Sequence, residues 1–119
     1  MQVVLSLIEE DLRQVPKPSQ LARVVNLSPS RFNHLFKTEI GTSPLQYLKV
    51  LRMERAKVLL TNTFLSVKEI MASVGVNDPS HFVREFKKNC GLTPSQYRRT
   101  HTDTARIKDN FAALSKPLT

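Results

Sequence analysis

The sequence has little of what most enzymes, metal proteins and membrane proteins need. Its 119 residues include one cysteine, Cys90, so no disulfide can form within the chain, as is typical of a reducing cytosol. The three histidines and this cysteine lack zinc-ligand spacing, and three glycines are too few for a glycine-rich phosphate loop. No apolar run approaches the ~18 residues of a membrane span, and no nucleophile motif such as G-x-S-x-G is present. These absences predict a cytoplasmic protein without catalytic activity, metal or cofactor.

Positive charge is abundant and localised. Lysine and arginine number 18 against 10 acidic residues, a net charge of +8. Residues 17–101 carry +9, whereas residues 1–16 carry −2. A localised positive field attracts polyanions. Nucleic acid is favoured over an anionic membrane, because no basic amphipathic stripe with tryptophan is present.

The chain contains an internal repeat. Residues 28–49 align with residues 78–99 without a gap, and nine of the 22 positions are identical. The identical pairs are Pro29/Pro79, Ser30/Ser80, Phe32/Phe82, Phe36/Phe86, Lys37/Lys87, Gly41/Gly91, Pro44/Pro94, Gln46/Gln96 and Tyr47/Tyr97. Two copies indicate a duplicated module rather than a solenoid.

Local signals make each copy helical. Ser28 and Asp78 are capping residues that each precede a proline, the favoured start of a helix. Apolar residues then recur at helical spacing, and Gly41 and Gly91 end each helix. Two short helices joined by a tight turn, present twice, are typical of helix-turn-helix modules.

A shorter helix precedes each of these two. The first is predicted over 19–25, with Asn26 as its left-handed turn residue. The second begins with a capping box formed by Ser66 and Glu69.

The remaining chain completes an all-α organisation of about seven helices without strands. Residues 45–60 contain no glycine or proline and predict one continuous linker helix, ~24 Å long. Residues 3–12 predict an amphipathic opening helix, and 106–114 a helical turn or two. The expected segments are an N-terminal helix-turn-helix module at 1–43, the linker helix at 44–61, a C-terminal module at 62–101 and a polar tail at 102–119.

A polar stripe lies opposite the predicted core face of each second helix. Asparagine suits adenine, arginine suits guanine, and an apolar side chain suits a thymine methyl group, whereas lysines suit phosphates. An ordinary solvated surface is the alternative explanation, and it applies most directly to the two histidines. The predicted base contacts are Ser30, Arg31, Asn33 and His34 in the first copy and Ser80, His81, Val83 and Arg84 in the second. The predicted phosphate contacts are Lys37, Lys87, Lys88, Arg98 and Arg99.

Three stretches of the sequence resemble the DNA-binding domain of the AraC/XylS family of bacterial transcription regulators. Residues 82–99 resemble the family signature, and 27–37 and 52–60 resemble its first recognition helix and its linker helix. The resemblance covers about residues 3–101. It implies seven helices, a rigid linker and two recognition helices that enter successive major grooves of an asymmetric site. One departure is Val76, where the family usually has an aromatic residue.

The resemblance also implies partners. These are double-stranded DNA and either RNA polymerase or an effector-binding or dimerisation domain outside this chain; no membrane is expected. Longer members of the family carry such a separate domain, so the chain is either a short stand-alone member or a fragment. The leading hypothesis is a sequence-specific DNA-binding transcription regulator. The alternative is a helical protein-interaction module whose basic surface binds an acidic partner.

Three further residues have structural explanations. Cys90 aligns with Ile40 and is predicted to be a buried thiol without a redox role. Tyr47 and Tyr97 are predicted to pack in the core, with a phosphate contact from the hydroxyl as the alternative.

Overall fold

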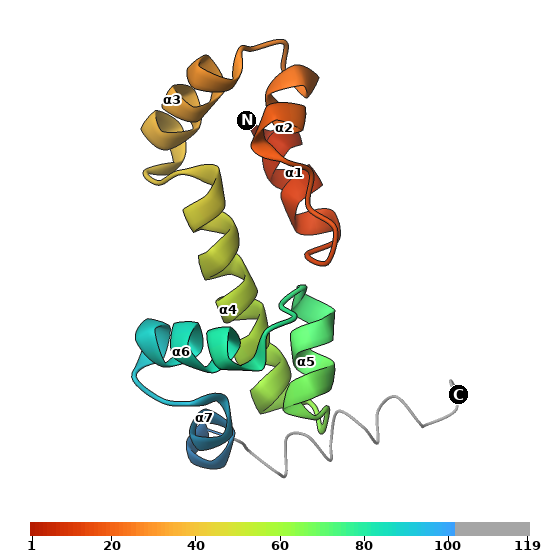
Figure 1. The fold of residues 1–119 in the computed structure, drawn as a ribbon, viewed down its shortest axis with the longest axis vertical. Coiled ribbons are helices and arrows are strands. Elements are labelled where there is room, and N and C mark those ends of the chain that lie inside the picture. Colours follow the sequence, from red (N-terminus) through yellow and green to blue (C-terminus); the bar gives the residue numbers. More distant parts are fainter. Residues whose placement is uncertain (102–119) are drawn as a thin grey trace, which may run out of the picture. The chain divides into compact units, whose positions relative to one another are not determined.

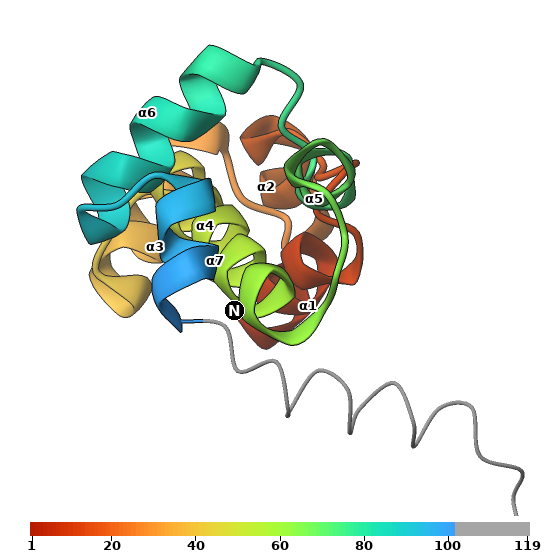
Figure 2. The same cartoon turned by 90° about the horizontal axis from the view of Figure 1, so that it is seen from below.

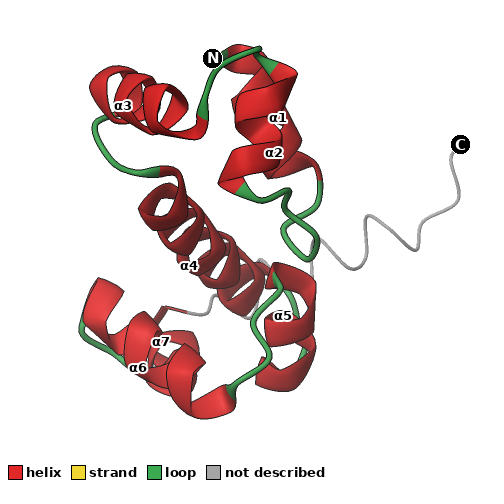
Figure 3. Cartoon of the chain, turned by 45° about the horizontal axis from the view of Figure 1, so that its top comes forward, coloured by secondary structure: helices red, strands yellow, loops and turns green. Residues whose placement is uncertain are grey.

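The computed structural model describes residues 1–101, and every regular element among them is an α-helix (Figures 1 and 3). The helices are α1 (Gln2–Glu10), α2 (Pro18–Val24), α3 (Pro29–Ile40), α4 (Pro44–Asn62), α5 (Val67–Val74), α6 (Pro79–Cys90) and α7 (Pro94–His101). The prediction of an all-α fold with seven helices is confirmed. The helical turn predicted over 106–114 lies outside the described residues.

The chain forms two compact units, and the boundary between them falls inside α4. The first unit ends at Arg52 and the second begins at Met53. α4 extends beyond the predicted 45–60 at both ends and has 19 residues, a length of ~28 Å. The Ser43 hydroxyl accepts a bond from the Gln46 N–H at the start, and the Asn62 amide donates to the Val58 carbonyl at the end. The limits predicted for the separate linker segment stay predictions.

The first unit has its own core, built by α1, α2, α3 and the first half of α4. α1 ends at Glu10 rather than at residue 12, because the Asp11 carboxylate accepts the Arg13 N–H and holds a turn there. The carbonyl of Leu12, outside the helix, accepts two bonds from the Arg52 guanidinium at 2.8 and 3.3 Å. Burial lowers the pKa of this guanidinium. The buried residues of this core are Val4, Ile8, Leu21, Ala22, Phe32 and Phe36.

The second unit repeats this plan around a separate core. α5 begins with the predicted capping box, in which Ser66 and Glu69 each accept the other's backbone N–H. α6 leads through a short connection into α7 (Figure 2). Val76, the departure from the family pattern, packs against this core. The buried residues are Met53, Ala56, Leu60, Ile70, Met71, Val74, Phe82 and Phe86.

Positive-φ residues end the helices as predicted. Asn26 adopts φ 57° after α2. Gly41 and Gly91 adopt φ 94° and 83°, and the N–H of each bonds to the carbonyl of Lys37 or Lys87. The two glycines therefore turn the chain out of α3 and α6 in the same way. Within the described part of the chain, no helix is both long and apolar enough to cross a membrane.

Candidate nucleic-acid interface

α3 presents the predicted base contacts of the first copy on its exposed side. The Ser28 hydroxyl accepts the Arg31 N–H at 3.2 Å and starts the helix, with Pro29 as its first residue. Phe32 and Phe36 are fully buried and orient the helix. Since a helix repeats every 3.6 residues, the opposite side faces solvent. Exposed on this side are Ser30, Arg31, Asn33, His34 and Lys37.

α6 does the same in the second copy. The Asp78 carboxylate accepts the N–H groups of Ser80 and His81 at 3.0 and 3.2 Å. Phe82 and Phe86 are buried in the core of the second unit, as Phe32 and Phe36 are in the core of the first. The exposed residues of α6 include Ser80, Val83, Arg84, Lys87 and Lys88, whereas His81 is half-buried.

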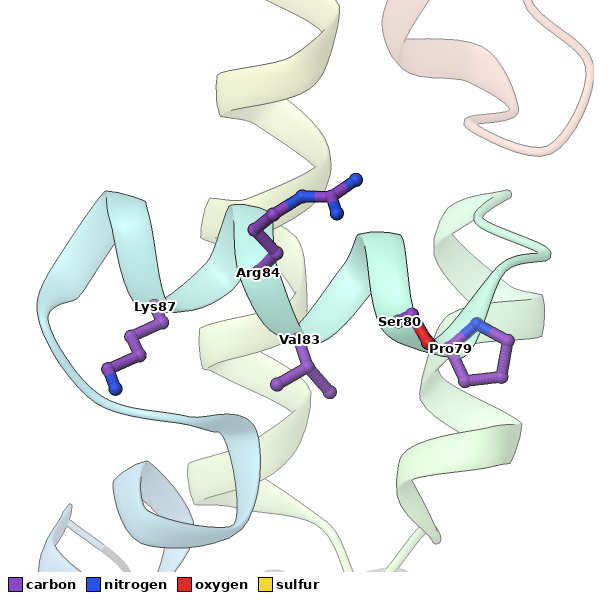
Figure 4. Close-up of a pocket in the computed structure, with 5 residues that line it drawn as sticks. All are labelled: Pro79, Ser80, Val83, Arg84 and Lys87. Atoms are coloured by element: carbon purple, nitrogen blue, oxygen red, sulfur yellow. The ribbon is translucent and has the colours of Figure 1, made fainter.

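A shallow hollow runs along the exposed side of α6 (Figure 4). It is lined by Pro79, Ser80, Val83, Arg84 and Lys87, all of them exposed. An Arg84 guanidinium nitrogen, Nη2, lies 3.5 Å from Nδ1 of His81, one turn earlier. The sequence predicted this stripe but not the hollow, because helical spacing gives the exposed side of a helix and not the relief of its surface.

The lysines of both helices lie in the last turn. Lys37 lies in the last turn of α3, and Lys87 and Lys88 lie in the last turn of α6. Cations near a helix C-terminus interact favourably with the helix dipole, so these positions cost the fold little. Each helix therefore has short polar groups in its N-terminal half and ammonium groups at its C-terminal end.

The structure separates the two arginines that the sequence had grouped as phosphate contacts. Arg98 is half-buried and its guanidinium donates to the carbonyls of Leu60 at 3.1 Å and Thr63 at 3.3 Å. Arg99 is exposed. Arg98 thus joins α7 to the C-terminal end of α4, a role that the sequence analysis missed. The repeat held a signal for it, because residue 98 aligns with Leu48, which packs against the core of the first unit.

Tyr47 and Tyr97 pack against the two cores as predicted, whereas Cys90 is half-buried rather than buried. The rings of Tyr47 and Tyr97 lie edge-on to Phe36 and Phe86, with centroids 5.8 and 5.4 Å apart. Burial, and then the hydrogen bond to Glu9, raises the pKa of the Tyr47 hydroxyl. The Cys90 thiol is half-buried against the core of its unit and donates to the Phe86 carbonyl at 3.4 Å. In residues 1–101, no three histidine, cysteine or acidic side chains gather as metal ligands would.

Two short helices joined by a tight turn, the second with a basic exposed side, define a helix-turn-helix protein, and this chain has the arrangement twice. The profile of a family described as "Helix-turn-helix domain" matches residues 21–100. The arabinose operon regulatory protein of Escherichia coli is 39% identical over 80 residues, which are 67% of this chain and 27% of that protein. The chain therefore belongs to the AraC/XylS family of helix-turn-helix transcription regulators.

Solved structures support the same family. The C-terminal domain of AraT, a response regulator from Geobacillus stearothermophilus, is 31% identical with a TM-score of 0.76, over 87% of this chain and 85% of that domain. The DNA-binding domain of AdpA, solved in complex with a target DNA, is 28% identical with a TM-score of 0.75, over 83% of this chain and 88% of that domain. The chain spans about a quarter of the length of the arabinose regulator, 27%.

Proposed function

We propose that this chain binds duplex DNA sequence-specifically as the DNA-binding part of a transcription regulator. It inserts α3 and α6 into two successive major grooves. The observation that carries the proposal is the repeated architecture of α3 and α6. In both helices a buried phenylalanine pair turns a polar and basic side to solvent.

The bases are contacted by side chains in the N-terminal halves of the two helices. Arg31, Asn33 and His34 on α3 differ from their counterparts His81, Val83 and Arg84 on α6. Because the two sets differ, a single chain contacts two different half-sites, and its DNA site need not be palindromic.

Phosphates are contacted by Lys37, Lys87, Lys88 and Arg99. Arg98 is left out of this set, because two of its guanidinium nitrogens, Nε and Nη2, already donate to backbone carbonyls and hold the side chain there. RNA polymerase and an effector-binding or dimerisation domain outside this chain stay predictions that rest on family resemblance. A cytoplasmic location stays a prediction that rests on the composition of the sequence.

Selection of bound duplexes from a random library tests the proposal. We expect one sequence class to be enriched, with log K falling linearly with log[salt]. Contact with ~6–10 phosphates would weaken binding ~10³- to 10⁵-fold between 50 and 200 mM salt. An acidic protein partner as the true ligand predicts that all duplexes bind alike, and that result would refute the proposal.

Two substitutions on α6 separate base contacts from phosphate contacts. Arg84→Ala should cost ~1–3 kcal/mol on the enriched duplex and relax the preference at one base pair. Lys87→Ala should weaken all duplexes about equally and lower the salt slope by ~1. A uniform loss from both substitutions would contradict the assignment of bases to the N-terminal half.

Spacing tests the use of two half-sites. An insertion of about five base pairs between them moves one half-site to the opposite side of the duplex. We expect one helix to lose its groove, so a footprint should shrink to one half-site. Full protection of both half-sites with unchanged affinity would contradict simultaneous binding by α3 and α6.

A further inference from the structure

The hollow on α6 has a mainly apolar lining, although it lies in a basic surface. Pro79 and Val83 supply the apolar lining, and Arg84 and Lys87 supply the positive charge. Val83 is 37% exposed and interrupts a stripe of polar residues. A single exposed valine is ordinary on a protein surface, so its significance depends on what this surface meets.

DNA offers this hollow one matching group. The edges of the bases in the major groove carry hydrogen-bond donors and acceptors, and the 5-methyl group of thymine is the apolar exception. The flanking guanidinium and ammonium groups attract the polyanion that carries this methyl group. Charge complementarity therefore brings DNA to the hollow, and apolar contact favours thymine at that position.

The Arg84 side chain leaves the hollow open. Its guanidinium contacts the His81 ring at 3.5 Å, on the preceding turn of α6. Arg84 and Val83 project in different directions from the helix (Figure 4). The guanidinium can thus contact a guanine while Val83 remains uncovered.

The first module supplies a natural contrast. Asn33 of α3 aligns with Val83 of α6, and its amide suits adenine rather than a methyl group. The two helices therefore differ at this one position in the kind of base contact that they can make.

We propose that the hollow over Pro79 and Val83 receives the 5-methyl group of a thymine, so that α6 selects thymine at a position where α3 does not. The inference rests on the proposed function, since it requires α6 to lie in the major groove. It goes further, because it assigns one functional group of the DNA to one place on the protein.

Methyl deletion in the DNA is the test. Each thymine of the duplex enriched by selection is replaced in turn by deoxyuridine, which lacks only the 5-methyl group. At one thymine in the half-site bound by α6, this replacement should weaken binding of the duplex to the full chain about three- to fivefold. That factor corresponds to the free energy of removing one methyl group from water.

Substitution of Val83, combined with deoxyuridine in the DNA, completes a double-mutant cycle. Val83→Ala should weaken binding of the thymine duplex by a similar factor and abolish the further effect of deoxyuridine at that position. The helix should remain intact, since Val83 is exposed and alanine is the best helix former. Val58→Ala, at a valine on α4 that is 47% exposed, is the control and should leave the deoxyuridine effect unchanged.

Each outcome bears on a different statement. Continued discrimination between sequences, with no thymine whose methyl effect depends on Val83, would overturn this inference and leave the proposed function intact. An enriched site without thymine in the α6 half would do the same. Loss of all discrimination between duplexes in the unsubstituted chain would overturn the proposed function, and this inference with it.

Discussion

Arg98→Ala and Arg99→Ala remove the same charge from adjacent positions of α7 but should affect different properties of the protein. Arg98 donates to the carbonyls of Leu60 and Thr63, at the C-terminal end of α4, from a half-buried position. Arg99 is exposed, and no hydrogen bond of its side chain is present among the described residues. We expect the first substitution to destabilise the C-terminal unit and the second to weaken DNA binding.

The magnitude follows from the two hydrogen bonds. A bond to a charged donor contributes ~1.5–3 kcal/mol when buried, and a cation at a helix C-terminus adds a few tenths to ~1 kcal/mol. Because Arg98 is only half-buried, water compensates for part of the lost hydrogen-bond energy. We therefore expect Arg98→Ala to lower the free energy of unfolding by ~1–3 kcal/mol in total. Such a loss lowers the Tm of a unit of this size by ~4–24 °C, at ~4–8 °C for each kcal/mol. An exposed substitution such as Arg99→Ala should stay within ~0.5 kcal/mol.

The assay must distinguish the two units, since each has its own core and unfolding need not be two-state. Amide hydrogen exchange does so, and Arg98→Ala should speed exchange in α5, α6 and α7 but not in α2 and α3. Arg98→Lys should recover only part of the loss, because one ammonium group cannot reproduce the guanidinium fork.

Salt-dependent DNA binding completes the comparison. Arg99→Ala should lower the slope of log K against log[salt] by ~1, and Arg98→Ala should leave it unchanged. Unaltered exchange together with a lower slope in Arg98→Ala would refute the structural role and return Arg98 to the phosphate contacts.

Three further predictions concern the signals that begin and end helices. Ser66→Ala should cost ~0.5–2 kcal/mol by removing the cap of α5, whereas Ser73→Ala on the exposed side of that helix should not destabilise, as chemical denaturation will measure. Gly91→Ala should cost ~1–2 kcal/mol because φ is 83° there, although an added Cβ would meet open space. Gly91→Asn should cost less. The Ser66 N–H lowers the pKa of the Glu69 carboxyl, so its stabilisation is present above the unfolded-state pKa and is lost as pH falls through the lower folded-state pKa. Glu69→Gln keeps an acceptor without a titrating group and should flatten the acid limb of stability against pH.

Each of these predictions can fail separately. A Ser66→Ala protein as stable as Ser73→Ala would show that the cap contributes nothing. Equal stability of the alanine and asparagine variants at Gly91 would contradict the conformational argument. An acid limb that is unchanged in Glu69→Gln would assign the pH dependence to other carboxyl groups.

The sequence by itself determined the number, order and approximate limits of the helices. The capping signals act on the backbone within a few residues of themselves, as Ser28, Asp78 and Gly41 do. Their effect can therefore be predicted from the sequence without knowledge of the tertiary structure. The internal repeat then indicated that the same module occurs twice. The end of α1 was misplaced because Leu12 continues the apolar period, while the Asp11 carboxylate bonds to the Arg13 N–H and turns the chain.

The sequence also placed the exposed stripe of each recognition helix, because the buried phenylalanines mark its opposite side. Only the tertiary structure decided which basic side chains of the second unit remain available to a partner. Arg98 and Arg99 are chemically identical and adjacent, yet Arg98 donates to carbonyls 38 and 35 residues earlier in the chain. The helical period predicts that residue 98 lies on the side of α7 that faces the core. It does not predict which groups the side chain contacts there. The acceptors are the carbonyl groups at the end of α4, which come within reach only when α7 packs beside them.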